Sequence, residues 1–227
     1  MSQPKPVQCI GIILDGNRRW AKEKGVPTLE GHRRGFETLK SIARAVRERD
    51  VPHLAVFVFS SENWNRPREE VAGLMDLLKE AVRGGTKDLV AEGMRLRSVG
   101  DPARLDEDVR AAIESVETES ASNRELTLWI CLSYGSRAEI VAAAEAAGAH
   151  EGLLTEELIR QHMWTAEMPD PDIIIRTGGQ KRLSNFLLWQ AAYSELFFRD
   201  VLWPDFKESD LDAVIEEYGN RQRNFGV

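Results

Sequence analysis

The sequence predicts a single α/β domain in which helices flank a central, mainly parallel sheet. Short apolar runs alternate with amphipathic helical patterns along the chain, which is typical of parallel strands joined by crossover helices. The run 54–59, Leu-Ala-Val-Phe-Val-Phe, is apolar on both faces, as expected for a central parallel strand. No repeat, low-complexity segment or linker divides the 227 residues, so we expect one domain over 1–227 with a flexible N-terminus at 1–8.

Apolar runs bounded by turn residues predict the strands of this sheet. In chain order these runs are 9–14, 54–59, 95–99, 126–132 and 172–176. Cys9 and Cys131 fall in two of them. Two buried thiols in a chain of this size indicate a reducing compartment rather than a disulfide framework.

The segments between the strands carry apolar residues at helical spacing. They predict helices over 32–49, 68–92, 106–120, from 136 onward, over 155–163 and over 207–218. Gly84 and Gly85 each weaken the second helix by about 1 kcal/mol, so we expect it to bend there. Ser136 and Glu139 have the spacing of a capping box, which predicts the start of the fourth helix.

Charge and hydropathy limit the classes of ligand and the cellular location that we expect for this chain. The net charge of −7 argues against general nucleic-acid binding, yet basic residues gather in short clusters at 18–24, 33–34 and 176–182, which indicates a compact anionic ligand. The first residues lack the apolar core of a signal peptide. The longest apolar run, 54–59, is far below the ~18 residues of a membrane span, so we expect a cytoplasmic protein.

The first predicted strand ends abruptly in Asp15-Gly16-Asn17, followed by Arg18, Arg19 and Lys22. Asp-Gly-Asn is turn chemistry, and Gly16 is free to take positive φ. Ligands bind at the carboxyl ends of strands in open α/β sheets. One carboxylate among cations suits a magnesium ion shared with a phosphate, with Asp15 on the metal and the basic side chains on the oxygens. The simpler alternative is a strand-to-helix turn with solvated charges.

Two further polar loops follow strands, at 60–67 and at 177–185. Because the carboxyl ends of parallel strands meet at one edge, we expect all three loops to converge. Thr177-Gly178-Gly179 removes side-chain bulk, so backbone N–H groups could approach phosphate oxygens there. Together the loops predict a site for two anionic groups beside one metal-binding acid.

Several long motifs, in order along 9–225, resemble the cis-prenyltransferases, with bacterial undecaprenyl diphosphate synthase the closest type. They are Asp15-Gly-Asn-Arg-Arg-Trp-Ala, Gly31-His32, Phe59-Ser-Ser-Glu-Asn-Trp-Asn-Arg-Pro67, Ile175-Arg-Thr-Gly-Gly179, Arg182-Leu-Ser-Asn-Phe-Leu-Leu-Trp-Gln190, and Tyr193-Ser-Glu-Leu-Phe-Phe198 through Val201-Leu-Trp-Pro-Asp205. The resemblance implies a homodimer with an apolar tunnel. It also implies a Mg²⁺-dependent transferase that adds isopentenyl diphosphate to an allylic diphosphate such as farnesyl or geranyl diphosphate, making Z double bonds and releasing pyrophosphate. A polyprenyl diphosphate product delivered to a membrane would place the enzyme in the cytoplasm or against the inner face of that membrane.

The resemblance also implies roles for individual residues. Asp15 and Glu195 match magnesium ligands, with Glu195 often reaching in from the partner subunit, and Ser60 and Asn63 match polar residues that assist proton removal. Residues matching the allylic diphosphate site are Gly16, Asn17, Arg19, His32 and Arg66, and those matching the isopentenyl diphosphate site are Arg176, Arg182 and Ser184. Substrate binding is assigned also to Arg18, Trp20, Ser61, Glu62 and Trp64.

The tunnel needs apolar walls. We expect them from the strand residues Leu54, Val56, Val58, Leu126, Leu128 and Ile130 and from the helical stripe Val71, Leu74, Met75 and Leu78. A packed core is the alternative for any such stripe. Val58 stands where long-chain members often have a smaller residue, which predicts a product shorter than the bacterial cell-wall carrier lipid.

The sequence departs from the family pattern at four positions. Arg18 replaces a glycine, and Thr28 stands where many relatives carry an arginine on the allylic diphosphate. We hypothesise that Arg18 partly replaces that arginine. Gln180 and Ser133 replace a usual glutamate and asparagine, which puts loop geometry and dimer contacts in doubt rather than the reaction class.

Three other functions stay open. The chain could couple two allylic diphosphates in an irregular head-to-middle condensation, although Asn63, Arg182 and Ser184 favour the ordinary reaction. It could be the non-catalytic subunit of a heteromeric prenyltransferase, although such subunits tend to lose the acid and arginine that stand here at Asp15 and Arg176. It could be a magnesium phosphatase, although the second aspartate of that class is replaced here by Asn17.

Overall fold

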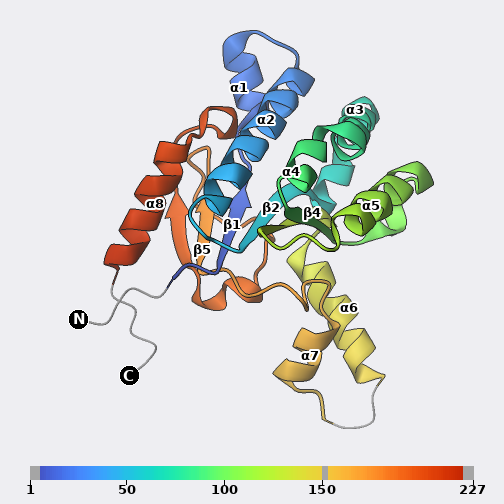
Figure 1. Cartoon of the computed structure of the whole chain (residues 1–227). Coiled ribbons are helices and arrows are strands. Elements are labelled where there is room, and N and C mark those ends of the chain that lie inside the picture. The colour runs from blue at the N-terminus through green and yellow to red at the C-terminus, as the bar shows by residue number, and fades with distance from the viewer. Residues whose placement is uncertain (1–5, 150–152, 222–227) are drawn as a thin grey trace.

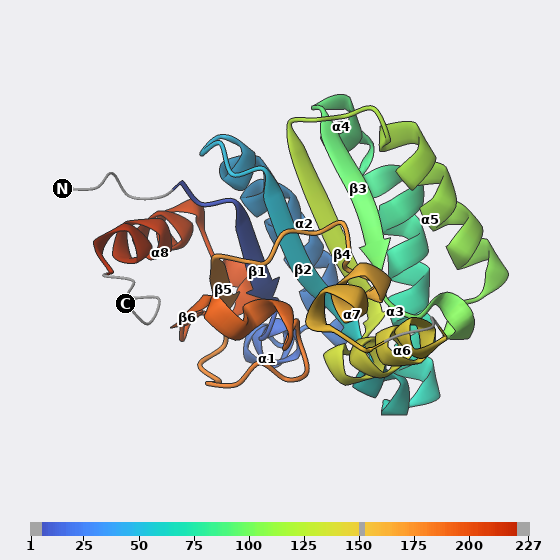
Figure 2. The ribbon, with the colours of Figure 1, turned by 90° about the horizontal axis from the view of Figure 1, so that it is seen from below.

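Six parallel strands form one sheet in the order β3-β4-β2-β1-β5-β6. The computed structural model describes residues 6–149 and 153–221, so most of the predicted flexible N-terminus and the basic end of the tail, 222–227, lie outside the described residues. The strands are β1 (Cys9–Ile13), β2 (His53–Ser60), β3 (Met94–Val99), β4 (Leu126–Tyr134), β5 (Ile173–Arg176) and β6 (Glu195–Phe198). Figure 2 shows them spread from β6 at one edge to β3 at the other.

Eight α-helices connect and cover these strands in the described part of the chain (Figure 1). They are α1 (Asn17–Lys24), α2 (Thr28–Arg47), α3 (Arg68–Glu80), α4 (Lys87–Ala91), α5 (Glu107–Ser120), α6 (Ser136–Gly148), α7 (Glu156–His162) and α8 (Glu208–Asn220). Short 3-10 helices include Ser61–Asn65, directly after β2. The predicted α/β fold with a mainly parallel sheet is confirmed.

Alternate residues of the strands bury themselves on opposite faces of the sheet. Ile10 and Ile12 of β1 pack with residues of α2 and α8, such as Ile42 and Val214, on one face. Ile13 packs on the other face with Phe186 and neighbouring residues of the long segment after β5. Because both faces are covered, the central strands are apolar throughout, as the run 54–59 predicted.

Most helices lie where the sequence places them, with two differences in detail. α2 begins at Thr28, directly after Pro27, four residues before the predicted start at 32. The predicted bend near Gly84 and Gly85 is a turn of π-helix at Ala81–Gly85, followed by the short α4. Glycines at this turn carry no side chain that would resist the wider winding.

The predicted capping box at Ser136 and Glu139 is wrong. Ser136 Oγ accepts from the Leu188 N–H at 2.9 Å, while the fully buried Glu139 carboxylate accepts hydrogen bonds from Tyr134, Thr165 and Gln190. Both side chains therefore bind segments distant in sequence. A buried carboxylate needs several donors, and the neighbouring segments supply more of them than the helix end could.

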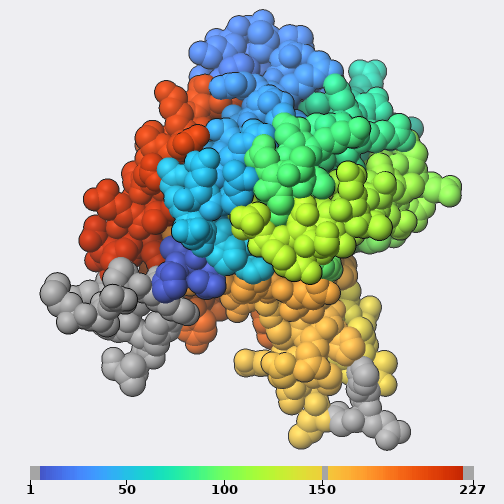
Figure 3. All heavy atoms as spheres, viewed as in Figure 1, coloured from blue at the N-terminus to red at the C-terminus, as the bar shows by residue number. Residues whose placement is uncertain are grey.

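β6 is an edge strand that was not predicted from the sequence. Its four residues lie in the apolar stretch 186–198, where no two-residue alternation stands out. α6 and α7 form an arm that stands out from the body of the molecule (Figure 3). Across 6–149 and 153–221, none of the helices has the length and apolar character needed to cross a bilayer.

Candidate active site

The carboxyl ends of β1 and β5 bring Asp15 and Arg176 into direct contact. Arg176 Nη2 donates to Asp15 Oδ2 at 2.8 Å, and Arg19 Nη2 donates to Asp15 Oδ1 at 3.1 Å. The strands are parallel neighbours with Ile13 opposite Arg176, so both chain ends reach the same edge of the sheet. The predicted convergence of the first and third loops is confirmed.

Two hydrogen bonds to its backbone carbonyl oxygen hold Asp15 at this edge. Thr177 Oγ1 donates to the Asp15 carbonyl oxygen at 2.7 Å, and the Trp203 N–H donates to the same oxygen at 3.0 Å. Gly16 follows with φ of 125°, the positive value that its turn predicted. The carboxylate stays 27% exposed, so it is anchored by the protein and still open to a ligand.

Arg176 links the acid to the third loop. Its side chain is only 5% exposed, and Nη1 donates to Arg182 O at 2.6 Å and to Ser184 Oγ at 2.7 Å. Arg182 Nη1 in turn donates to Gln180 Oε1 at 2.7 Å. Gln180, one of the departures from the family pattern, therefore orients a predicted substrate-binding arginine without adding a charge.

A second group of cations lies around His32 at the start of α2. Burial, and then the charges of Arg66 and Arg18, lower the pKa of His32 from 6.5 to about 4, although Glu70 opposes this. Glu70 Oε1 accepts from Arg66 Nη1 at 3.1 Å and lies 3.7 Å from Arg18 Nε. His32 is therefore neutral near pH 7 and sits in a positive field that a diphosphate would relieve.

The loop after β2 is held by short-range hydrogen bonds. Asn63 Oδ1 accepts from the Ser60 N–H at 3.1 Å, which closes the start of the 3-10 helix Ser61–Asn65. Trp64 Nε1 donates to Ser133 Oγ at 3.0 Å. Ser133, another departure from the family pattern, thus accepts a hydrogen bond from this loop and anchors it to β4.

One cavity of about 400 Å³ joins the polar loops to an apolar interior. Predicted site residues that line it are Asp15, Asn17, His32, Ser60, Asn63, Arg66, Arg176, Arg182 and Ser184. Predicted site residues outside the lining are Gly16, Arg18, Arg19, Trp20, Ser61, Glu62, Trp64 and Glu195. The structure thus gathers the predicted residues of all three loops around one space.

Only some of the predicted tunnel-wall residues line the apolar part of this cavity. Its walls include the predicted residues Val58, Leu74, Met75, Leu78 and Ile130, joined by Phe36, Leu39, Leu77, Ala81, Val82 and Leu132. The predicted wall residues that do not line it are Leu54, Val56, Leu126, Leu128 and Val71.

The first four of these lie in the core at 0–1% exposure, because α2 packs directly on that part of the sheet. Val71 lines a separate surface depression instead. The prediction was therefore wrong for these five residues. Residues that line the cavity and residues that pack in the core are of the same apolar types, so residue type alone does not distinguish them.

Glu195 is not brought to Asp15 within one chain. It opens β6 beside Ile173, which pairs with Ile10, whereas Asp15 follows the other end of β1. Ile10 and Ile13 alone are about 10 Å apart at 3.3 Å per residue, and Asp15 lies beyond Ile13. Glu195 Oε2 instead accepts from Arg221 Nη1 at 2.6 Å.

Three residues in the lining of the cavity have a buried polar atom without a hydrogen-bond partner within the described residues. The atoms are Asn17 Oδ1, His32 Nε2 and Arg176 Nε. Buried polar groups are normally paired, so atoms of this kind at a cavity point to a polar ligand.

Magnesium in proteins is held by one or two carboxylates together with phosphate oxygens of a substrate. Asp15 supplies one such carboxylate, and no cluster of three or more His, Cys, Asp or Glu side chains suited to a metal exists within 6–149 and 153–221. Arg19 and Arg176 bind both of its oxygens. The residues fit a magnesium ion that arrives with a diphosphate rather than one bound by the protein alone.

Two residues that build this site were not predicted as site residues from the sequence. Trp203 lines the cavity, and its Nε1 donates to Gly35 O at 2.8 Å. Asn185 Nδ2 donates to Glu62 Oε1 at 2.9 Å and so connects the second and third loops. Trp203 and Asn185 both lie in motifs that carry the family resemblance, but their partners are far away in sequence, so the motifs did not show these contacts.

Comparison with known proteins shows the family of this chain. A family model described as "Putative undecaprenyl diphosphate synthase" matches residues 13–226. The isoprenyl transferase of Agrobacterium fabrum is 47% identical over 225 residues, which cover 96% of this chain and 91% of that protein. The isoprenyl transferase of Porphyromonas gingivalis is 47% identical over 224 residues, which cover 96% and 88%.

Two solved structures share the fold across nearly the whole chain. A lavandulyl diphosphate synthase from Lavandula x intermedia, in complex with dimethylallyl diphosphate, has a TM-score of 0.94 at 35% identity and covers 98% of this chain and 99% of that one. A Campylobacter jejuni structure described as a "probable undecaprenyl diphosphate synthase" has a TM-score of 0.85 at 31% identity, with 98% and 100% covered. The chain therefore belongs to the undecaprenyl diphosphate synthase family, and it is an enzyme that transfers prenyl groups.

Proposed function

We propose that the protein is a Mg²⁺-dependent elongating prenyltransferase. It condenses isopentenyl diphosphate with an allylic diphosphate in Z configuration, releases pyrophosphate and makes a polyprenyl diphosphate. The observation that supports this most is that one cavity is lined both by the polar side chains of Asp15, Arg176 and His32 and by many aliphatic side chains. A substrate with a diphosphate head and an apolar chain matches that division.

The allylic diphosphate is proposed to bind near Asn17, Arg19, His32 and Arg66, beside the backbone of Gly16. Breaking its C–O bond leaves the electron pair on the departing diphosphate. Fixed positive charge at that place stabilises the transition state more than the ground state. Magnesium held by Asp15 and the diphosphate would add a further cation on the leaving group.

The isopentenyl diphosphate is proposed to bind Arg176, Arg182 and Ser184. A carbon–carbon bond forms to the allylic carbon, and the condensing unit loses one proton to complete the new double bond. Ser60 and Asn63 line the same cavity and are proposed to assist that proton removal. The side chains of Ser61, Glu62 and Trp64 lie in the same loop and would support it, while Trp20 and Arg18 lie on α1 beside the allylic site.

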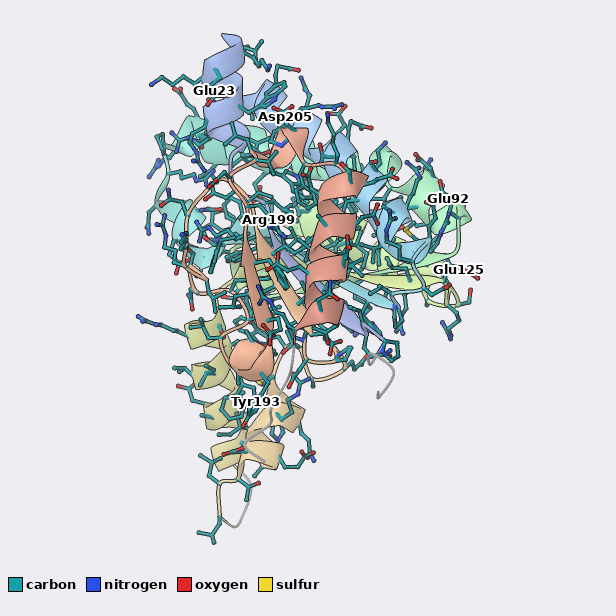
Figure 4. The ribbon with its side chains drawn as sticks, turned by 90° about the vertical axis from the view of Figure 1, so that its left-hand side faces the viewer. Glu23, Glu92, Glu125, Tyr193, Arg199 and Asp205 are labelled. Atoms are coloured by element: carbon teal, nitrogen blue, oxygen red, sulfur yellow. The ribbon has the colours of Figure 1, made fainter. Side chains whose placement is uncertain are left out.

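We propose a homodimer through the β6 edge of the sheet. Tyr193 is 78% exposed and Leu196 is 36% exposed, both on this side of the molecule, where Figure 4 labels Tyr193 and Arg199. Unpaired strand edges with exposed apolar side chains favour association with another chain. A dimer formed through the β6 edge would bring Glu195 of one chain to the Asp15 site of its partner.

The product is proposed to be shorter than the bacterial cell-wall carrier lipid. The cavity, about 400 Å³, lies near the lower end of the 300–1,000 Å³ typical of small-molecule sites. An apolar product leaves water for a bilayer, so we propose delivery to a membrane.

A second candidate function is the irregular coupling of two allylic diphosphates. It is favoured by the fold similarity, at a TM-score of 0.94, to a structure that contains dimethylallyl diphosphate. Under this alternative the Arg182 and Ser184 site would hold a second allylic molecule.

One experiment tests both. The pure protein is incubated with magnesium, isopentenyl diphosphate and primers of different length, and in parallel with dimethylallyl diphosphate alone. The proposal predicts products that grow in five-carbon steps, with Z double bonds by NMR, pyrophosphate release and loss of activity with a chelator. Products from dimethylallyl diphosphate alone, with none from the mixture, would contradict it and support the second candidate.

A further inference from the structure

We propose that Asn185 is a positioning residue that joins the loop after β2 to the loop after β5 and thereby sets Ser184 for the isopentenyl diphosphate. This inference rests on the function proposed above. Asn185 Oδ1 accepts from the Arg137 N–H at 2.9 Å, and Asn185 Nδ2 donates to Glu62 Oε1 at 2.9 Å. The carbonyl oxygen of Asn185 accepts from the Ser136 N–H, also at 2.9 Å.

The backbone at this point needs external support. Ser184 and Asn185 have φ values of 50° and 66°, in the left-handed region that costs an ordinary residue roughly 1–2 kcal/mol. Such conformations persist when the surroundings impose them. The first N–H groups of a helix have no partner within the helix, and those of Ser136 and Arg137 supply two hydrogen bonds to Asn185.

The neighbour of Asn185 belongs to the site. Ser184 Oγ accepts from Arg176 Nη1 at 2.7 Å, and Arg176 Nη2 binds Asp15 at 2.8 Å. A change in the backbone at Asn185 therefore moves the hydroxyl that binds Arg176. Asn185 itself is outside the lining of the cavity, so it acts through Ser184.

The opposite end of the amide reaches the second loop. Glu62 lies between Ser61 and Asn63 in the 3-10 helix that follows β2. Burial favours the protonated form of Glu62, but hydrogen bonds from Asn185, Ser61 and Ser60 outweigh it and lower the pKa of the carboxyl. The carboxylate is therefore an ionised acceptor at neutral pH, and the amide N–H is its partner across the two loops.

Gly135 makes room for this contact. A Cβ at that position would lie 2.7 Å from Asn185 Nδ2 and would overlap Ser61 Oγ. The loops after β2, β4 and β5 thus meet around one glycine, and the asparagine side chain is the group that spans them.

The substitution Asn185→Asp separates the two functions of the side chain. It keeps an acceptor for the Arg137 N–H and a residue type that tolerates positive φ, but it places a second carboxylate against Glu62. We expect the Kd and KM for isopentenyl diphosphate to rise about tenfold or more, as for loss of a charged hydrogen bond. The KM for the allylic diphosphate is expected to rise less than that for isopentenyl diphosphate, because Asn17 and Arg19 of that site lie on α1 and His32 lies on α2, and only Arg66 follows the loop that Asn185 contacts.

The double variant Asn185→Asp with Glu62→Gln restores the link with reversed polarity, because the glutamine amide can donate to the introduced carboxylate. We expect its Kd for isopentenyl diphosphate to return to within about threefold of the Glu62→Gln single variant. Glycine accepts φ of 66° without strain but cannot form either side-chain hydrogen bond, so Asn185→Gly should weaken the binding of isopentenyl diphosphate as Asn185→Asp does. It replaces Asn185→Asp in the test if that variant fails to fold.

Asn123→Asp is the matched control. Asn123 Nδ2 donates to Val90 O at 2.7 Å and Met94 O at 2.9 Å, away from the cavity, so this variant should lower the Tm without changing either KM.

Calorimetric Kd values, measured alongside KM, distinguish the possible failures. Unchanged isopentenyl diphosphate affinity in Asn185→Asp, or no recovery in the double variant, overturns this inference and leaves the proposed function intact. A wild-type protein that binds the diphosphate but makes no product overturns the proposed function alone. A wild-type protein that binds no isopentenyl diphosphate overturns both.

Discussion

Arg176 and Asp15 form an ion pair of 2.8 Å at the ends of neighbouring strands, and the Arg176 side chain is 5% exposed. The same guanidinium binds Arg182 O and Ser184 Oγ. A single buried cation therefore connects the proposed metal-binding acid with the proposed isopentenyl diphosphate site. Removing either side chain is expected to weaken both the proposed metal site and the proposed isopentenyl diphosphate site.

Replacing Asp15 with asparagine should abolish most of the activity. The amide keeps the shape but loses the charge that holds magnesium, so we expect kcat to fall about 100-fold or more. Because the carboxylate is 27% exposed, we expect a loss of about 1–2 kcal/mol in unfolding free energy, less than for a fully buried pair. Steady-state kinetics and chemical denaturation measure the two effects.

Asp212→Asn is a control, since Asp212 pairs with Arg49 outside the cavity. A folded Asp15→Asn or Asp15→Ala protein that elongates prenyl chains at the wild-type rate would contradict the assignment of Asp15.

Magnesium should bind strongly only together with a diphosphate. Among the described residues, Asp15 is the single carboxylate in the lining of the cavity, and two arginines repel a bare cation. Titration calorimetry should show Mg²⁺ affinity at least about tenfold higher with pyrophosphate present, and Asp15→Asn should remove that gain. Equal affinity without pyrophosphate would show that the protein alone forms the metal site.

The stability of the protein should fall in mild acid partly because of His32. The pKa of His32 is lowered from 6.5 to about 4, so between these values the unfolded chain binds the proton and the folded chain does not. The contribution is fully present above pH 6.5 and is lost as the pH falls towards 4. This contribution to the free energy of unfolding is about 3 kcal/mol, because each unit of difference between the two pKa values corresponds to 1.36 kcal/mol.

Denaturation of wild type and His32→Gln at several pH values isolates this effect, because the glutamine does not titrate. A parallel pH dependence in both proteins would contradict it.

Val58→Ala should lengthen the product. Val58 lines the cavity, so its truncation extends the apolar space available to a growing chain. Val56→Ala is a matched control on the same strand, because Val56 is fully buried in the core and does not line the cavity. It should cost stability, about 1–3 kcal/mol, without changing the product. Mass spectrometry of both product mixtures tests the assignment, which unchanged products from Val58→Ala would contradict.

Arg18→Gly should weaken the binding of the allylic diphosphate. Arg18 lies 3.7 Å from Glu70, beside Arg66 and His32, although its side chain is 60% exposed. The loss is expected to be about tenfold in KM for that substrate. Arg18→Ala keeps the helix propensity of α1, and Arg34→Ala, also exposed, controls for net charge. An unchanged KM for the allylic substrate would refute the hypothesis that Arg18 replaces the missing arginine at Thr28.

The chain itself determined the strands and the chemistry at their ends. Buried parallel strands must be apolar on both faces, so the runs at 9–14, 54–59 and 172–176 could be recognised, and the polar residues after them had to meet at one edge. Asp15, Arg176 and Ser184 were predicted in this way and lie together.

Contacts between distant segments were decided only by the tertiary structure. Ser136 and Glu139 have helix-capping spacing but bind the segments at Leu188 and Thr165. Val56 and Val58 lie two residues apart in β2, yet the register shifts between Phe57 and Phe59, so Val56 lies in the core while Val58 lines the cavity. Asn185 joins two loops that lie far apart in the chain. Local sequence sets backbone preference and burial pattern, whereas the partner of a side chain depends on which other element packs against it.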